Sequence, residues 1–102
     1  MTKPHLICYD ISSNTLRAKM AKKIIEFGLD RINKSVYLGP IDATSLQQLE
    51  QILLTALQLK GEPDDSLIIL PILASQVQEM KIYGRNDLDK DELSGEKTTL
   101  IL

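Results

Sequence analysis

The 102-residue chain has little of what secreted, membrane-spanning or thiol-dependent proteins require. Its single cysteine cannot form an internal disulfide, so a reducing cytoplasm is the expected location. The first five residues lack the long apolar stretch of a signal peptide, and no apolar run reaches the length that spans a bilayer. There is no internal repeat and no low-complexity segment. We therefore expect one soluble intracellular domain that has no contact with a membrane.

Charge is distributed unevenly along the chain, although its sum is only −2. Residues 1–40 carry seven Lys or Arg against three Asp or Glu, whereas residues 41–102 carry five against eleven. The sum gives no general case for nucleic acid, but the basic part supplies a candidate phosphate-binding set, namely Arg17, Lys19, Lys22, Lys23, Arg31 and Lys34. A solvated helix face explains Lys19, Lys22 and Lys23 equally well.

An apolar run at residues 6–11 has the composition of a central strand and carries Asp10 near its end. Residues 12–14, Ser-Ser-Asn, are good helix N-caps, so Asp10 lies where a strand leads into a helix, a position at which ligands and metals collect. One reading makes Asp10 a magnesium ligand. The other makes it a helix cap or the partner of Arg17, which projects within the apolar arc of that helix. The residues alone leave both readings open.

Hydrophobic periodicity predicts the next elements. A helix over residues 15–27 ends at Gly28 in a left-handed C-cap. Residues 31–38 form one bent strand or a very short pair of strands, and we favour a bend or bulge near Ser35. A second helix begins at Thr44 or Ser45 in a capping box and ends at Gly61. Residues 66–73 predict an interior strand in which Pro71 marks the end or an edge position.

The C-terminal part changes character. Residues 74–83 predict one or two helical turns, residues 84–96 are charged and linker-like, and residues 97–102 form a plausible strand that can reach a neighbouring chain. The sequence thus predicts an α+β, ferredoxin-like domain over residues 1–84 in β-α-β-β-α-β order. Residues 85–102 are expected to be an acidic arm and an extra C-terminal strand exchanged in a homodimer.

Several stretches together resemble the CRISPR-associated protein two (Cas-two) family. They are Tyr9-Asp10-Ile11, the early Arg17, the stretch Gly-Leu-Asp-Arg-Ile-Asn-Lys-Ser-Val-Tyr at residues 28–37, and Asp-Ser-Leu-Ile-Ile-Leu-Pro at residues 65–71. The resemblance covers nearly the whole chain. Asn33 stands where the family often has Gln, Tyr37 where it often has Phe, and Lys19 where some members carry a second arginine.

The resemblance implies a homodimer that acts in CRISPR spacer acquisition, where it bridges two dimers of the integrase subunit in a heterohexamer and holds the DNA fragment to be inserted. It also implies a metal-dependent endonuclease that cuts RNA or double-stranded DNA. In that case Asp10 is the catalytic and metal-binding residue of each subunit, faces its mate across the dimer, and holds Mg²⁺ or another divalent cation. No other residue is an evident general base.

Three functions therefore stay open: the nuclease, a non-catalytic scaffold of the integrase complex, and a related toxin-type ribonuclease. In each, contact with nucleic acid would be to the backbone, because no base-reading motif is present. Tyr9 and Tyr37 stack on bases or sugars in one reading and pack in the core in the other. We expect His5 at the surface and Cys8 as a small buried hydrophobe, and assign neither to chemistry.

Overall fold

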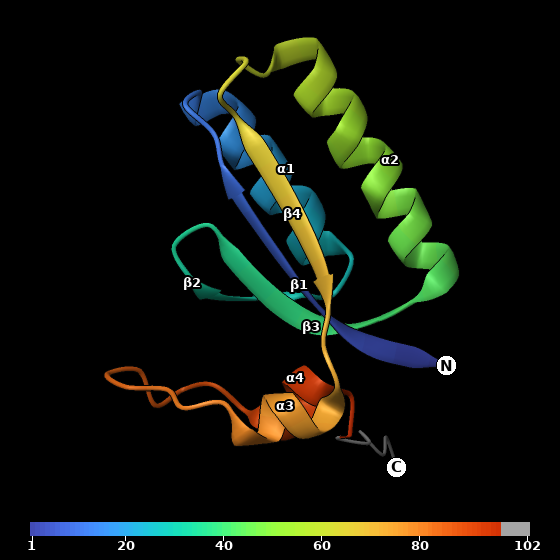
Figure 1. The fold of residues 1–102 in the computed structure, drawn as a ribbon, viewed down its shortest axis with the longest axis vertical. Coiled ribbons are helices and arrows are strands. Elements are labelled where there is room, and N and C mark those ends of the chain that lie inside the picture. The colour runs from blue at the N-terminus through green and yellow to red at the C-terminus, as the bar shows by residue number, and fades with distance from the viewer. Residues whose placement is uncertain (97–102) are drawn as a thin grey trace.

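The computed structural model describes residues 1–96 and contains a four-stranded antiparallel sheet in the order β2-β3-β1-β4 (Figure 1). Its elements are β1 (Thr2–Asp10), α1 (Asn14–Glu26), β2 (Asp30–Asn33), β3 (Val36–Asp42), α2 (Ala43–Lys60), β4 (Ser66–Pro71), α3 (Ala74–Glu79) and α4 (Lys90–Ser94). This α+β arrangement is compatible with the predicted ferredoxin-like plan. The expected C-terminal strand lies outside the described residues. Within residues 1–96, no helix has the length and apolar character to cross a membrane.

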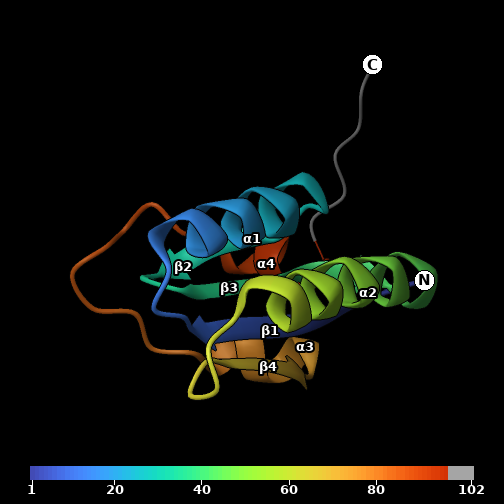
Figure 2. The same ribbon diagram turned by 90° about the horizontal axis from the view of Figure 1, so that it is seen from above.

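The main core lies between the sheet and helices α1 and α2, which run side by side over it (Figure 2). Side chains alternate along each strand, so Ile7 of β1 and Tyr37 of β3 point to this side and are fully buried. Helix α1 adds Leu16, Met20 and Ile24, and α2 adds Leu49 and Leu53 at helical spacing. The periodicity in the sequence predicted both helices correctly.

The opposite face of the sheet carries a smaller apolar cluster near the beginning of β1. Leu38 of β3, Val77 of α3 and Leu93 of α4 form its buried centre, and Leu6 of β1 packs against it. The description of residues 84–96 as linker-like is therefore wrong, because this segment forms α4 and buries Leu93 against the chain's own sheet. Exchange of the arm between chains stays a prediction.

Residues 30–42 form a short hairpin, which is the pair of strands that the sequence left open, and the chain turns near Ser35, where we favoured a bend or bulge in one strand. The turn places Ser35 at φ 60°, in the left-handed region, and the strand register shifts between Arg31 and Asn33. The backbone carbonyl of Ser35 accepts a hydrogen bond from the Tyr9 amide (3.2 Å). The hairpin turn consequently lies beside the end of β1 that carries Asp10.

Two other expectations need correction. Helix α2 begins at Ala43 rather than at Thr44 or Ser45. The Asp42 side chain accepts a hydrogen bond from the Ser45 amide and serves as the N-cap. Among residues 1–96, strand β4 is an edge strand rather than an interior one, since it pairs there with β1 alone, and Pro71 is its last residue. The stops at Gly28 (φ 96°) and Gly61 are as predicted.

Candidate active site

Asp10 is the last residue of β1, and its side chain is exposed. In the strand register it lies opposite Ser66, the first residue of β4. Within residues 1–96 the Asp10 carboxylate has no hydrogen-bond or ion-pair partner. A strand end that is fixed by its neighbour thus presents a carboxylate that no other described group engages.

Both structural roles proposed for Asp10 belong to other residues. The N-cap of α1 is Ser13, whose hydroxyl oxygen accepts a hydrogen bond from the Leu16 amide (3.2 Å). The Arg17 guanidinium donates through Nη1 to the backbone oxygens of Ile11 (2.6 Å) and Ser12 (3.3 Å), and not to Asp10. The reading of Asp10 as a helix cap or as the partner of Arg17 is therefore excluded.

A second carboxylate, Asp65, holds the loop that follows Asp10. Its Oδ1 accepts hydrogen bonds from the Ser12 amide and the Ser12 hydroxyl, both at 3.0 Å, and its Oδ2 accepts one from the Glu62 amide (2.8 Å). These bonds, that of Glu62 first, lower the pKa of Asp65, and the charge of Arg17 adds to the effect. In the sequence, Asp65 was counted in the stretch 65–71 that resembles the family but was given no site role, because nothing in its spacing links it to residue 12.

The face of the sheet that carries Asp10 is apolar and partly uncovered. The register places Cys8 opposite Ile68 and Leu6 opposite Leu70, so these side chains share one face with Asp10. Ile68 and Leu70 are exposed by 55% and 51%, and nearby Leu73 by 57%. Cys8 is only partly buried here, contrary to expectation. Asp10 accordingly stands at one end of an apolar surface that α3 and α4 leave uncovered.

The described side chains could hold a cation at Asp10 only if groups from outside the chain complete its coordination. Across the described part of the chain, no three His, Cys, Asp or Glu side chains gather in a group that could hold a metal. Mg²⁺ nevertheless keeps most of its waters and needs one or two protein carboxylates in addition to substrate phosphate. One Asp10 carboxylate per chain fits this requirement when a second chain or a phosphate completes the site.

The predicted basic residues fall into two groups. Lys19 and Lys22 are exposed on α1, and Lys34 is exposed in the turn between β2 and β3. None of these three forms an ion pair within residues 1–96. Lys23 is ion-paired with Glu26 (3.3 Å), and Arg17 is half-buried and occupied by the backbone oxygens of its own loop. Lys19, Lys22 and Lys34 are therefore more available to bind phosphate than Lys23 and Arg17.

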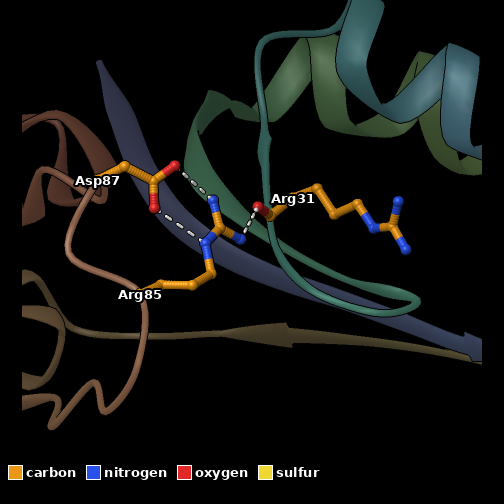
Figure 3. A network of polar contacts seen from close by, with 3 residues as sticks. All are labelled: Arg31, Arg85 and Asp87. Atoms are coloured by element: carbon orange, nitrogen blue, oxygen red, sulfur yellow. Dashed lines mark hydrogen bonds and ion pairs between the residues drawn. The ribbon is translucent and has the colours of Figure 1, made fainter.

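Arg31 lies on β2 beside the arm that follows α3 (Figure 3). The Arg85 guanidinium forms an ion pair with Asp87 (2.9 Å) and donates a hydrogen bond to the backbone oxygen of Arg31 (3.0 Å). Figure 3 shows the Arg31 side chain extending away from this pair. Its charge is exposed and remains available to a ligand, while Arg85 is held in place by its contacts.

The two tyrosines are in the core. Tyr9 is 9% exposed and Tyr37 is 1% exposed, and their rings stack on each other with centroids 5.9 Å apart. Neither ring therefore presents a face to a base, and we leave both out of the nucleic-acid surface that the sequence had suggested. His5 is also buried rather than at the surface, and its Nδ1 lies 2.9 Å from the backbone oxygen of Lys3.

Comparison with known proteins assigns the chain to a family. Residues 3–80 match the family described as CRISPR associated protein Cas2. Among named relatives, the CRISPR-associated endoribonuclease Cas2 of Korarchaeum cryptofilum is 32% identical over 80 residues, which cover 78% of this chain and 83% of that protein. The protein of the same name from Aeropyrum pernix is 34% identical over 80 residues, covering 78% of this chain and 80% of that protein.

A solved structure is also similar. It is the crystal structure of a hypothetical protein, TT1823, from Thermus thermophilus, with a TM-score of 0.61 and 28% sequence identity. The match covers 71% of this chain and 83% of that chain. The match to the family covers residues 3–80, which include Asp10, and the matches to the named relatives each cover 78% of the chain. The chain therefore belongs to the Cas2 family of CRISPR-associated proteins.

Proposed function

We propose that the chain is a metal-dependent endonuclease that hydrolyses phosphodiester bonds, with Asp10 as its catalytic carboxylate. The observation that carries the proposal is the exposed Asp10 side chain at the end of β1. Asp10 neither caps α1 nor pairs with Arg17. Relatives of similar length are named endoribonucleases, which favours RNA over double-stranded DNA as the substrate.

Asp10 would hold a divalent cation such as Mg²⁺. When bound, the cation polarises a phosphoryl oxygen and lowers the pKa of a water molecule. The chain itself contributes a carboxylate fixed by the pairing of Asp10 with Ser66. The exposed cations Lys19, Lys22 and Lys34 would attract the phosphate backbone without reading sequence.

The active form would be a homodimer formed through the uncovered sheet face. Ile68, Leu70 and Leu73 are large apolar side chains exposed by more than half, and such surfaces generally mark an interface. Asp10 lies on the same face as Ile68 and Leu70. A two-fold axis through this face would bring two Asp10 carboxylates toward each other, and the pair would suit one shared cation.

We also propose a role in CRISPR spacer acquisition, as a partner of two integrase dimers. Membership of the Cas2 family supports this role. A non-catalytic scaffold is the second candidate, since the exposed side chains of Lys19 and Lys22 would bind DNA equally well in a chain that does not cut. The match over residues 3–80 gives a toxin-type ribonuclease no support.

The test is cleavage of labelled RNA and duplex DNA by the wild type, Asp10→Asn and Asp64→Asn, with Mg²⁺ and with EDTA. Asp64 is a matched control because it is an exposed carboxylate in the turn before β4. We expect cutting that EDTA and Asp10→Asn abolish and that Asp64→Asn leaves intact. Cutting that survives Asp10→Asn would refute the assignment. No cutting, with spacer acquisition intact in Asp10→Asn, would establish the scaffold.

A further inference from the structure

The loop between β1 and α1 is anchored from two sides. Arg17 donates to the backbone oxygens of Ile11 and Ser12, and Asp65 accepts from the Ser12 amide and the Ser12 hydroxyl. Asp10 directly precedes this loop. The conformation of the residues that follow Asp10 is therefore set by two charged side chains that do not contact Asp10 itself.

The contact between Asp65 and Ser12 lies just beyond the end of the β1–β4 ladder, whose last pair is Asp10 and Ser66. Asp10 lies opposite Ser66 in the register, and Asp65 precedes Ser66 while Ser12 follows Asp10 by two residues. The bonds from Ser12 to Asp65 thus continue the β1–β4 pairing one step beyond its end. Terminal pairs of a ladder open at little cost, so a side-chain link at this point would keep Asp10 in place.

Asp65 is itself rigidly held. Its Oδ2 accepts from the Glu62 amide (2.8 Å), and its own amide donates to the Glu62 backbone oxygen (3.0 Å). Both carboxylate oxygens are therefore engaged by groups of the protein. This distinguishes Asp65 from Asp10, whose oxygens no described group engages.

From this geometry we infer that Asp65 is a positioning residue for Asp10, acting through Ser12 to fix the strand end that presents the catalytic carboxylate. The inference rests on the proposed nuclease function. Asp65 would not touch the substrate, so its loss should lower kcat and leave KM unchanged. A misplacement of about 1 Å at a reacting group costs about 100-fold in rate, so we expect a fall in kcat of roughly 10- to 100-fold for Asp65→Ala.

The experiment compares the wild type with Asp65→Ala, Asp65→Asn and Asp64→Ala in RNA cleavage, well below the unfolding temperature of each. The Asn side chain keeps an oxygen for Ser12 but presents an NH₂ group to the Glu62 amide, so Asp65→Asn should fall between Asp65→Ala and the wild type. Asp64→Ala should match the wild type. Hydrogen exchange of the Ser12 amide is measured in parallel, and should be faster in Asp65→Ala.

An unchanged kcat in folded Asp65→Ala, an equal loss in Asp64→Ala, or a change in KM alone would overturn the inference. Unchanged exchange of the Ser12 amide would also overturn it. If the wild type shows no cleavage that depends on Asp10, the proposed function fails and the inference fails with it. Faster exchange of the Ser12 amide in Asp65→Ala would then show that Asp65 does hold the loop at Ser12, and that it is the proposed nuclease activity that fails.

Discussion

The hydroxyl groups of Tyr9 and Tyr37 lie 3.0 Å apart in the core, where β1 and β3 face the helices. The Tyr9 hydroxyl also lies 3.5 Å from the backbone oxygen of Arg17, at the beginning of α1. The pair therefore links the two central strands to the helix that follows Asp10. Aromatic residues suggested by the sequence for contact with nucleic acid serve the interior of this fold instead.

Tyr37→Phe should destabilise the fold without weakening nucleic-acid binding. The substitution removes the hydroxyl partner of Tyr9 and leaves the ring in place, so the free energy of unfolding should fall by about 1 kcal/mol. Urea unfolding measures this decrease, and RNA binding of the folded variant serves as its control. A large drop in affinity with unchanged stability would return Tyr37 to the binding surface.

Stability should also depend on Tyr37 at high pH. Burial, followed by the hydrogen bond and charge of Tyr9, raises the pKa of Tyr37 from 10.0 to about 12. In the unfolded chain the phenol returns to about 10, so the unfolded state loses its proton first. The stability contributed by neutral Tyr37 is complete below pH 10 and is lost as the pH rises toward about 12. Urea titrations across this range should show a shallower decline for Tyr37→Phe than for the wild type.

Replacing both Lys19 and Lys22 by Gln should weaken RNA and DNA binding equally across sequences. Both side chains are exposed on α1 without an ion pair in the described region. Each lysine that binds a phosphate adds about one to the magnitude of the slope of log affinity against log salt, so the double variant should lose about two. Filter binding at several salt concentrations measures the slope. Lys60→Gln is the control, since Lys60 is an exposed lysine on the other helix. Equal effects of the two changes would contradict a local phosphate surface.

Ile68→Lys should convert the proposed dimer into monomers. Ile68 lies on the uncovered sheet face, and a charge in the centre of an apolar interface should raise the dissociation constant at least about tenfold. Sedimentation equilibrium measures it. Leu59→Lys is the matched control, because Leu59 is 74% exposed on α2, away from this face. A dimer that dissociates with Leu59→Lys and persists with Ile68→Lys would place the interface on the helical side.

The sequence predicted those parts of the fold that depend on periodicity and on stop signals. Leu16, Met20 and Ile24 recur at helical spacing, and Gly28 ends α1 with a positive φ. A bend or bulge near Ser35 was predicted, but not the tight turn between two paired strands, because serine adopts φ 60° rarely and gives no signal for it. Burial of Leu93 was missed because a single apolar residue among charges has no periodicity to reveal a buried face.

At the candidate site, the sequence predicted where Asp10 lies in the fold, but not which groups the neighbouring charged side chains contact. Asp10 was predicted at a strand end and is found there, exposed. What the sequence left open was the partner of each charged group. Arg17 binds backbone oxygens, and the link between Ser12 and Asp65 joins residues separated by 53 positions. Such pairings depend on the register of β1 with β4, which local patterns do not specify.

The most direct test is binding of Mn²⁺, a paramagnetic substitute for Mg²⁺, followed by broadening of amide signals in NMR spectra. We expect selective broadening at Asp10 and at Ser66, its partner in the register, in the wild type and in Asp64→Asn. Asp10→Asn should abolish it while the remaining spectrum keeps its dispersion. Broadening that persists in Asp10→Asn, or none near residue 10 in the wild type, would contradict the assignment of Asp10 as the carboxylate that holds the cation.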